Sequence, residues 1–350
     1  MARPLKRKLA YFLLLVMAPL AMAEGLVRLS GKAPKLLDLP FFEEAEGLPY
    51  LHRRNHELRG HNSTGEFELE ARVNSRGFFD TEWVLPKPAG LRRILMLGDS
   101  FTGGTGRKGA RFYVNEVEKL LRERWGAEKV ECVNFGVGGY FTQVERRLLE
   151  LRGWELEPDA VVLNFTIGDI IDTYRGVEAI RLSHTGLLRA KHEEALGPVG
   201  TRLFIHSHAL RWLLKQVVLN RQGFIMGDNL AEAYLPNGLH EPQWQDVLAE
   251  IEKVHALCKE RKLPFFLVYI PQYPAWLPGQ DHPDKRLAAW AADKGFPYIR
   301  VLDSIRELAQ SGAVVSYPKD GHYTDEGEAV LSKAVAGALE ESLGSLWFPR

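Results

Sequence analysis

The chain has 350 residues and a mass of 39.6 kDa, of which 45% are hydrophobic and 26% are charged. This composition is typical of globular proteins and excludes a polytopic membrane protein, a collagen-like fibre and a wholly disordered chain. Acidic and basic residues balance at 45 each. Because the chain has no basic excess, no basic stripe and no zinc-finger spacing, we expect no nucleic-acid partner.

The first 23 residues have the composition of a targeting segment. Basic residues at positions 3, 6, 7 and 8 precede an uncharged apolar run from Leu9 to Ala23, and small residues at 21 and 23 close it. This order indicates an export signal. The run is short for a membrane span of about 20 residues, so the sequence leaves open whether segment 1–23 is cleaved or retained as an anchor in the inner membrane. In both cases we expect an exported protein of the cell envelope or periplasm.

Two cysteines, Cys132 and Cys258, each lie within an apolar stretch. An exported protein could form a disulfide, but these stretches have the patterns of a buried strand and of a helix. We therefore expect two buried thiols that act as small hydrophobic residues. Their spacing suggests neither a metal site nor a thiol nucleophile.

The chain changes character near residue 91. Residues 24–90 are rich in charge, glycine and proline, with patches such as Phe67-Glu68-Leu69-Glu70 that alternate like a strand. We interpret them as a neck and a lead-in segment that packs on the main domain. From residue 91 onward, short apolar segments alternate with segments of helical spacing. The predicted strands are 93–97, 129–135, 159–165, 264–270 and 297–302. The predicted helices are 114–125, 142–151, 243–262, 283–294 and 324–343, the last of them capped by Thr324.

Such alternation predicts an α/β protein with a parallel sheet that is covered by helices on both faces. We therefore expect a three-layer α/β/α sandwich of the flavodoxin type, with a parallel five-stranded sheet, over residues 91–350. An insertion at about 170–240 interrupts the alternation and contains a predicted helix at 209–219.

Residues that directly follow the strands are the first candidates for a site, because ligands bind beyond the carboxyl ends of the strands in such sheets. Three blocks follow predicted strands and a fourth precedes the last helix. The blocks are Gly98-Asp99-Ser100-Phe101, Asn134-Phe135-Gly136-Val137-Gly138-Gly139, Ile167-Gly168-Asp169 and Asp320-Gly321-His322.

These four blocks, in this order, resemble those of the SGNH hydrolases, also called the GDSL esterase family. The resemblance covers residues 91 to about 343 and does not account for the insertion. The segment Asn74-Ser75-Arg76-Gly77-Phe78 is similar to membrane-anchored bacterial members. The resemblance implies cleavage of an acyl ester through an acyl-serine intermediate, with no metal and no organic cofactor.

A serine hydroxyl becomes a useful nucleophile when a base takes its proton and a third group orients that base. The resemblance implies Ser100 as the nucleophile, His322 as the base and Asp320 as the orienting acid. The Asp-x-His spacing is similar to that of the alginate acetyltransferase branch, and Gly321 allows the tight turn that it requires. Asp281-His282 is an alternative acid and base pair.

The resemblance also implies an oxyanion hole formed by the backbone N–H groups of Ser100 and Gly139 and by an asparagine amide of the third block. Here Gly168 stands in place of that asparagine, so the third donor is missing. Thr166, one side-chain repeat earlier on the same strand face, is a candidate replacement. An ionised Asp169 cannot donate a hydrogen bond.

Two further groups of residues could suggest a ligand. We expect the histidines at 52, 56, 61, 206 and 208 to be structural or solvent-facing, because no cysteine or acid pattern for a metal accompanies them. The aromatic residues Tyr269, Tyr273 and Trp276 follow a predicted strand. They fit either a stacking surface for a sugar ring or packing beneath a loop.

Taken together, these features predict a serine esterase that acts on an acyl ester, with an acetyl ester of a cell-envelope carbohydrate as the leading substrate class. An O-acyltransferase that uses the same serine is the first alternative. A carbohydrate-binding scaffold that has lost turnover is the second.

Overall fold

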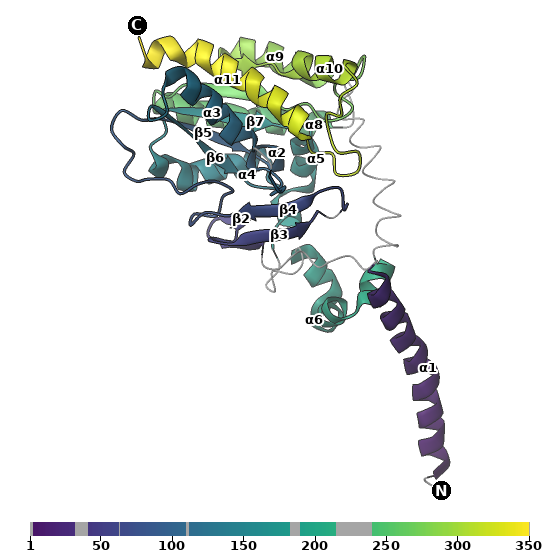
Figure 1. Ribbon diagram of the computed structural model, residues 1–350. Helices are drawn as coiled ribbons and strands as arrows, with labels where there is room; N and C mark the ends of the chain where they lie inside the picture. The colour runs from purple at the N-terminus through teal and green to yellow at the C-terminus, as the bar shows by residue number, and fades with distance from the viewer. Residues whose placement is uncertain are drawn as a thin grey trace. The chain divides into compact units, whose positions relative to one another are not determined.

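In a computed structural model of the chain, the described residues are 3–31, 41–62, 64–109, 112–182, 190–214 and 240–349. They belong to two compact units. The first comprises Met1–Leu39 and Leu182–Asp228, and the second comprises Pro40–Arg181 and Asn229–Arg350. The second unit contains the sheet with its covering helices (Figure 1).

The second unit is built on a parallel five-stranded sheet with the order β6-β5-β7-β8-β9. The strands are β5 Arg92–Gly98, β6 Val130–Gly136, β7 Ala160–Phe165, β8 Phe265–Tyr269 and β9 Tyr298–Ile299. The predicted α/β sandwich with a five-stranded parallel sheet is confirmed. Because β6 and β7 lie on opposite sides of β5, the strand order reverses there, which is the position where such sheets bind ligands.

The strands are buried on both faces, which explains their nearly continuous apolar sequences. In β5, Ile94 and Met96 join the core cluster that α3 (Tyr113–Trp125) and α11 (Asp325–Trp347) cover. Leu95 lies against Gly153 on the other face of the sheet. Contacts between α4 (Thr142–Leu148), α5 (Gly168–Arg175) and α8 (Glu241–Glu260) form the second helical layer. The sheet thus separates two helical layers (Figure 1).

The covering helices agree with the predicted segments except near the end of the chain. Their bounds are α3 Tyr113–Trp125, α4 Thr142–Leu148, α8 Glu241–Glu260, α9 His282–Lys294 and α11 Asp325–Trp347. The Thr324 hydroxyl accepts the N–H of Gly327 as expected of an N-cap. The predicted strand 297–302 is too long, because β9 has two residues and the chain enters helix α10, Leu302–Gln310, directly afterwards.

The lead-in segment contains two antiparallel hairpins, of which the sequence indicated only the strand-like patch at 67–70. They are β1 Phe42–Ala45 with β2 Leu48–His52, and β3 Glu57–His61 with β4 Glu68–Arg72. The segment after them is bound to the sheet by Arg93, whose fully buried guanidinium donates to Glu131, to the Leu156 carbonyl and to the Val84 carbonyl. The 24–90 segment from residue 41 onward therefore packs on the main domain.

The Asn74–Phe78 motif is a turn that fixes the lead-in segment. The Asn74 side-chain oxygen accepts the N–H groups of Arg76 and Phe78, both at 3.0 Å. Gly77 has a φ of +95°, and a Cβ there would lie 2.9 Å from the His52 carbonyl oxygen. Phe78 then stacks on Phe135 of β6. The motif therefore has a structural role here.

The first unit contains helix α1, Arg3–Ser30, and helix α6, Ala190–His206, followed by a short helical segment at 208–214. Within α1, the stretch Tyr11–Ser30 is long and apolar enough to cross a membrane. Of the predicted helix 209–219, the part up to 214 is helical and the remainder lies outside the described residues.

As expected, Cys132 and Cys258 are buried and unpaired.

Candidate active site

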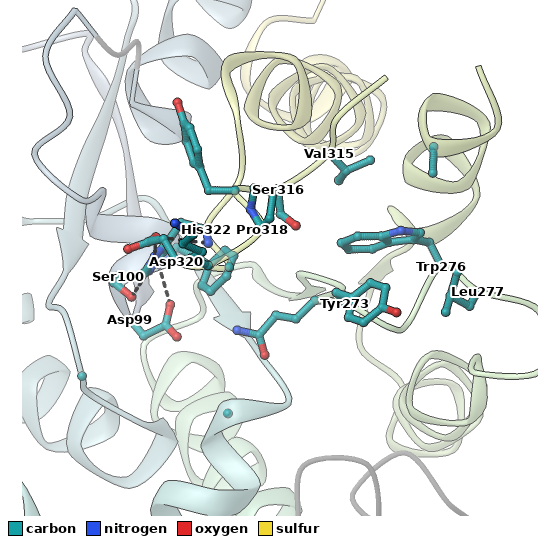
Figure 2. A pocket seen from close by; sticks show the side chains of 18 of the residues that line it. Asp99, Ser100, Tyr273, Trp276, Leu277, Val315, Ser316, Pro318, Asp320 and His322 are labelled. Atoms are coloured by element: carbon teal, nitrogen blue, oxygen red, sulfur yellow. Dashed lines mark hydrogen bonds and ion pairs between the residues drawn. The ribbon is translucent and has the colours of Figure 1, made fainter. Parts of the chain in front are cut away.

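The predicted site residues gather at the point where the strand order reverses. Ser100, Gly139 and Gly168 follow β5, β6 and β7 and line one cavity of about 840 Å³, together with Asp320 and His322. Figure 2 shows Ser100, Asp320 and His322 at one end of this cavity and Tyr273 and Trp276 at the other. One cavity could therefore hold the reacting group of a substrate beside Ser100 and the rest of an extended substrate beside Tyr273 and Trp276.

Ser100 begins the short helix α2, Ser100–Gly103, immediately after β5. The carboxylate of Asp99 caps this helix by accepting the Phe101 N–H at 2.8 Å. The helix packs closely on the end of β6, because a Cβ at Gly103 would lie 2.6 Å from the Gly136 carbonyl oxygen. These contacts hold the serine at one end of the cavity.

His322 joins Ser100 to Asp320. The Ser100 Oγ lies 2.7 Å from His322 Nε2, and His322 Nδ1 lies 2.5 Å from Asp320 Oδ1. An imidazole protonated on Nδ1 donates to Asp320 and accepts the serine proton on Nε2, which is the tautomer that a general base requires. The structure thus brings together the three residues that the sequence assigned to catalysis.

The short Asp-x-His spacing is possible because the loop turns tightly between the two residues. Gly321 has a φ of +89°, a conformation that favours glycine. The Gly321 N–H donates to the Tyr317 carbonyl at 2.8 Å, and the Tyr317 N–H donates to the His322 carbonyl at 2.9 Å. The Phe101 ring packs against the His322 imidazole, with 4.6 Å between the ring centroids.

Asp320 is held in its charged form. Burial alone would raise its pKa, but hydrogen bonds from His322 and Asn62 and the charge of His322 together hold the pKa of Asp320 below its usual value. The carboxylate therefore stays ionised well into the acid range. It can stabilise an imidazolium without taking the proton itself.

Sequence reasoning missed Asn62 as part of this site. Its side-chain amide donates to Asp320 Oδ2 at 3.1 Å, while its carbonyl oxygen accepts the N–H groups of Glu66 and Phe67. Asn62 lies directly after β3, and a carboxylate oxygen of Glu66 accepts the Lys319 N–H at 3.1 Å. The β3–β4 hairpin thus reaches across to the loop that carries the acid and the base. No local pattern in residues 57–72 indicates this contact.

The alternative pair Asp281-His282 is placed differently. Asp281 forms ion pairs with Lys285 and Arg306 beside a separate hollow, and His282 opens helix α9. Within the described part of the chain, no contact joins either residue to Ser100 or to the main cavity. The structure does not support this pair as the acid and the base.

The oxyanion region has the expected glycine. Gly139 has a φ of +80° in the turn that closes with the Tyr140 N–H on the Val137 carbonyl, and it lines the cavity with Ser100. A Cβ on Gly138 would lie 3.7 Å from the Cβ of Ser100, so this turn abuts the serine. The N–H groups of Ser100 and Gly139 are therefore available as a pair of donors.

Thr166 does not replace the missing amide. Its hydroxyl is fully buried and lies 3.1 Å from both Asp99 Oδ2 and Asp169 Oδ1, so these two carboxyl groups occupy it. Asn164 is occupied as well, since its amide donates to the Leu97 carbonyl and accepts from Tyr113. Among the described residues that line the cavity, Gln272 carries the one side-chain amide.

Three carboxyl groups cluster behind the serine loop. Burial raises the pKa of Asp169 and of Glu145 well above the usual values, and charge repulsion within the set Asp99, Glu145 and Asp169 acts in the same direction. The Thr166 hydroxyl has one proton and can donate to only one of its two carboxyl neighbours. A protonated Asp169 resolves this, because it donates to Thr166 and Thr166 then donates to Asp99.

His52 and the three aromatic residues singled out in the sequence have different surroundings in the structure. His52 is buried, its Nδ1 lies 3.1 Å from the Gly77 carbonyl oxygen, and burial lowers its pKa to about 4. Within the described residues, no group of three histidine, cysteine or acidic side chains could hold a metal ion. Tyr269 is buried, whereas Tyr273 and Trp276 line the cavity with ring centroids 5.9 Å apart.

Comparison with known proteins gives matches among solved structures, 61 chains in all. A lipolytic protein of the G-D-S-L family from Veillonella parvula is 14% identical, with 70% of this chain and 97% of that chain covered and a TM-score of 0.40. A catalytic mutant of an acetylxylan esterase from Geobacillus stearothermophilus is 14% identical, with 71% and 93% covered and a TM-score of 0.44. A two-domain esterase active on acetylated mannans is 17% identical, with 72% and 50% covered and a TM-score of 0.41.

Neither a protein-family model nor a curated protein matches the chain. Two of the solved structures that match carry the description that the four sequence blocks led us to expect, the G-D-S-L lipolytic family. The similarity to the alginate acetyltransferase branch stays a prediction.

The buried carboxyl of Glu145 should make stability depend on pH. A folded chain that keeps this proton binds more protons than the unfolded chain, so the free energy of unfolding should fall as pH rises above the usual range of a glutamate. Glu145→Gln should make that slope less steep by the share of one proton, which is at most about 1.4 kcal/mol per pH unit. Urea unfolding at about pH 5 and about pH 8 measures it, with exposed Glu123→Gln as the control. Equal slopes in the wild type and in Glu145→Gln would show that Glu145 is ionised when folded.

Asn62 should position the acid. Asn62→Ala should lower kcat about tenfold, a loss of about 1.4 kcal/mol for one charge-assisted hydrogen bond, with little change in KM. Asn62→Asp should lower it further, because an added negative charge beside Asp320 favours the protonated imidazole. The acidic limb of the kcat/KM profile should then move to higher pH. Arg59→Ala, an exposed residue of the same hairpin, is the control. An unmoved profile in Asn62→Asp would show that Asn62 only supports the hairpin.

Proposed function

We propose that this chain is a serine ester hydrolase of the SGNH type. The observation that carries the proposal is the hydrogen-bonded chain from Ser100 Oγ through His322 to Asp320, placed where the strand order of the sheet reverses. A nucleophile, a base on its hydroxyl and an acid on the far nitrogen of that base form the constellation used for acyl transfer on several unrelated folds.

The reaction follows from these positions. Ser100 Oγ attacks the ester carbonyl carbon while His322 Nε2 takes the hydroxyl proton, and the tetrahedral oxyanion accepts from the N–H groups of Ser100 and Gly139. The C–O bond to the alcohol then breaks, and His322 returns the proton to the leaving oxygen. A water molecule, deprotonated by His322, attacks the acyl-serine. Collapse of the second tetrahedral intermediate releases the carboxylic acid and restores Ser100.

The cavity favours a substrate whose alcohol is a sugar. Tyr273 is 60% exposed, and with Trp276 it presents aromatic faces at the end of the cavity away from Ser100. Sugar rings have apolar faces that pack on such rings. Asp172 and Gln272 also line the cavity and are polar groups of the kind that bind sugar hydroxyl groups. An acetyl ester of a cell-envelope carbohydrate fits this arrangement, with export directed by the N-terminal segment.

The proposal is tested by ester turnover. Ser100→Ala and His322→Ala should each reduce hydrolysis of an aryl acetate to near the uncatalysed rate, and by similar factors, because the two residues act as a unit. Ser316→Ala and His282→Ala are matched controls, since Ser316 lines the same cavity without joining the hydrogen-bonded chain. Full activity in Ser100→Ala would contradict the assignment.

Hydrolysis and transfer share the acyl-serine and differ in the acceptor. Release of acetate from an acetylated oligosaccharide in water supports the hydrolase. Acetyl groups found on an added unacetylated oligosaccharide, with little free acetate, support an O-acyltransferase instead. Binding of the oligosaccharide without either product would support a non-catalytic scaffold.

The oxyanion hole lacks the amide of the third block, so the wild type should be slow. Removing one oxyanion donor elsewhere costs about 10²–10³ in rate. Gly168 lines the cavity at the first position of helix α5, Gly168–Arg175, and a Cβ there meets only the Thr166 hydroxyl, at 3.3 Å. Gly168→Asn should therefore raise kcat on a short aryl ester about tenfold or more, with Gly168→Ala as the control for backbone effects. A slower Gly168→Asn would mean that another group, such as the Gln272 amide, already supplies the third donor.

A further inference from the structure

The first unit has a surface that the reaction at Ser100 does not use. Helix α1 exposes long apolar side chains along its length, among them Leu14 at 69%, Leu15 at 72% and Leu20 at 58%. A contiguous apolar surface of this size is normally buried against lipid or another protein rather than exposed to water. The basic residues that precede this apolar stretch and the length of the helix favour a lipid bilayer as the partner that buries it.

Glu24 joins the far end of α1 to the insertion. One carboxylate oxygen of Glu24 accepts the His208 N–H at 2.9 Å, and the other accepts the Ala209 N–H and the Ser207 hydroxyl, both at 2.9 Å. Glu24 thereby caps the helical segment 208–214 from outside that segment. Arg28, one turn further along α1, donates to Glu24 at 2.7 Å and to the His206 carbonyl at 3.1 Å.

This network favours an intact α1. A chain cleaved after Ala23 would begin at Glu24, and the first residues of a chain are poorly ordered unless they are tied down. Here Glu24 lies well inside the 28-residue helix Arg3–Ser30, with Arg28 held on the same face. The helix before Glu24 keeps the carboxylate in the position from which it caps the insertion.

The insertion exposes apolar side chains of its own. Val199 and Leu203, four residues apart on one face of α6 beyond the kink at Gly197, are 74% and 57% exposed, and Leu213 of segment 208–214 is 53% exposed. Arg202 is exposed on the same turn. Apolar side chains on one face with a basic residue beside them are typical of helices that lie in the membrane interface.

The position of Glu24 along helix α1 also favours the bilayer as the partner of this surface. The uncharged run from Leu9 to Ala23 spans about 22 Å as a helix, which is less than the hydrocarbon thickness of about 30 Å. A stretch shorter than the hydrocarbon layer is accommodated by local thinning of the bilayer and by the flanking residues. Glu24, the first charged residue after the run, therefore marks the end at which the helix leaves the hydrocarbon. Because Glu24 contacts residues 207–209 directly, it holds the insertion at that same depth.

We propose that α1 is retained as a membrane anchor and that residues 190–214 lie on the lipid surface on the non-cytoplasmic side, fastened to α1 by Glu24. The partner is the bilayer itself. The apolar side chains of Val199, Leu203 and Leu213 enter its interface, and Arg202 stays among the headgroups. This arrangement is independent of the chemistry at Ser100.

The test uses the full chain in vesicles of phosphatidylethanolamine and phosphatidylglycerol. A fluorophore is attached at Leu203→Cys, and the two native thiols do not interfere because both are buried. Lipids that carry a nitroxide near the headgroup should quench this label several-fold relative to vesicles of the same composition without the nitroxide. Equal fluorescence in the two kinds of vesicle would overturn the proposal.

A second measurement isolates the role of Glu24. Glu24→Ala should leave the protein in the vesicles but reduce quenching at Leu203, whereas Glu178→Ala, a change at an exposed glutamate paired with Arg181, should not. Unchanged quenching in Glu24→Ala would overturn the role of Glu24. Mass spectrometry of protein expressed in a bacterial host and extracted from its membranes should find residues 9–23 still attached. A chain that begins at residue 24 would contradict a retained anchor.

Discussion

The site depends on two consecutive hydrogen bonds, from Ser100 to His322 and from His322 to Asp320, between residues that are far apart in the sequence. Ser100 begins helix α2 directly after β5, whereas His322 and Asp320 come from the loop before the last helix. Close packing of α2 on the end of β6 fixes one side of this contact. The turn at Gly321 and the Asn62 amide fix the other. A catalytic constellation must be held to a fraction of an ångström, and here rigid elements and a hairpin from the lead-in segment supply that restraint.

The same region buries three carboxyl groups, and burial makes their ionised forms unfavourable. Asp99 caps the serine helix from a buried position, and Asp169 and Glu145 lie behind it in a medium that disfavours ionised carboxyl groups. Protonation of Asp169 allows Thr166 to donate to Asp99, which steadies the cap. It also occupies the hydroxyl that could have completed the oxyanion hole. The arrangement thus favours a firmly held Ser100 over a full set of donors at the proposed oxyanion hole.

Much of this could be predicted from the sequence because its signals are local or strongly patterned. Apolar runs such as 93–97 and 159–165 marked strands buried on both faces, and the four blocks placed Ser100, Gly139 and His322 at one sheet edge. Features that depend on contacts between distant residues were missed. The β3–β4 hairpin alternates weakly because much of it is exposed, and nothing near Asn62 indicates Asp320 as its partner. Helix α10 was not predicted, and its first residue, Leu302, was assigned to the preceding strand because Val301 and Leu302 are apolar like the residues of β9. Glu24 was hidden for a similar reason, since its partners lie more than 180 residues away.

The central claim is that Ser100 becomes acylated through His322. The most direct measurement is mass spectrometry of the chain quenched rapidly during turnover of an activated acetyl ester, with the labelled peptide identified. The account predicts an acetyl group on Ser100 in the wild type, more of it when a poor acceptor slows the second step, and none on this peptide in Ser100→Ala. Continued turnover with no acetyl group on Ser100, or with the group on another residue, would contradict it.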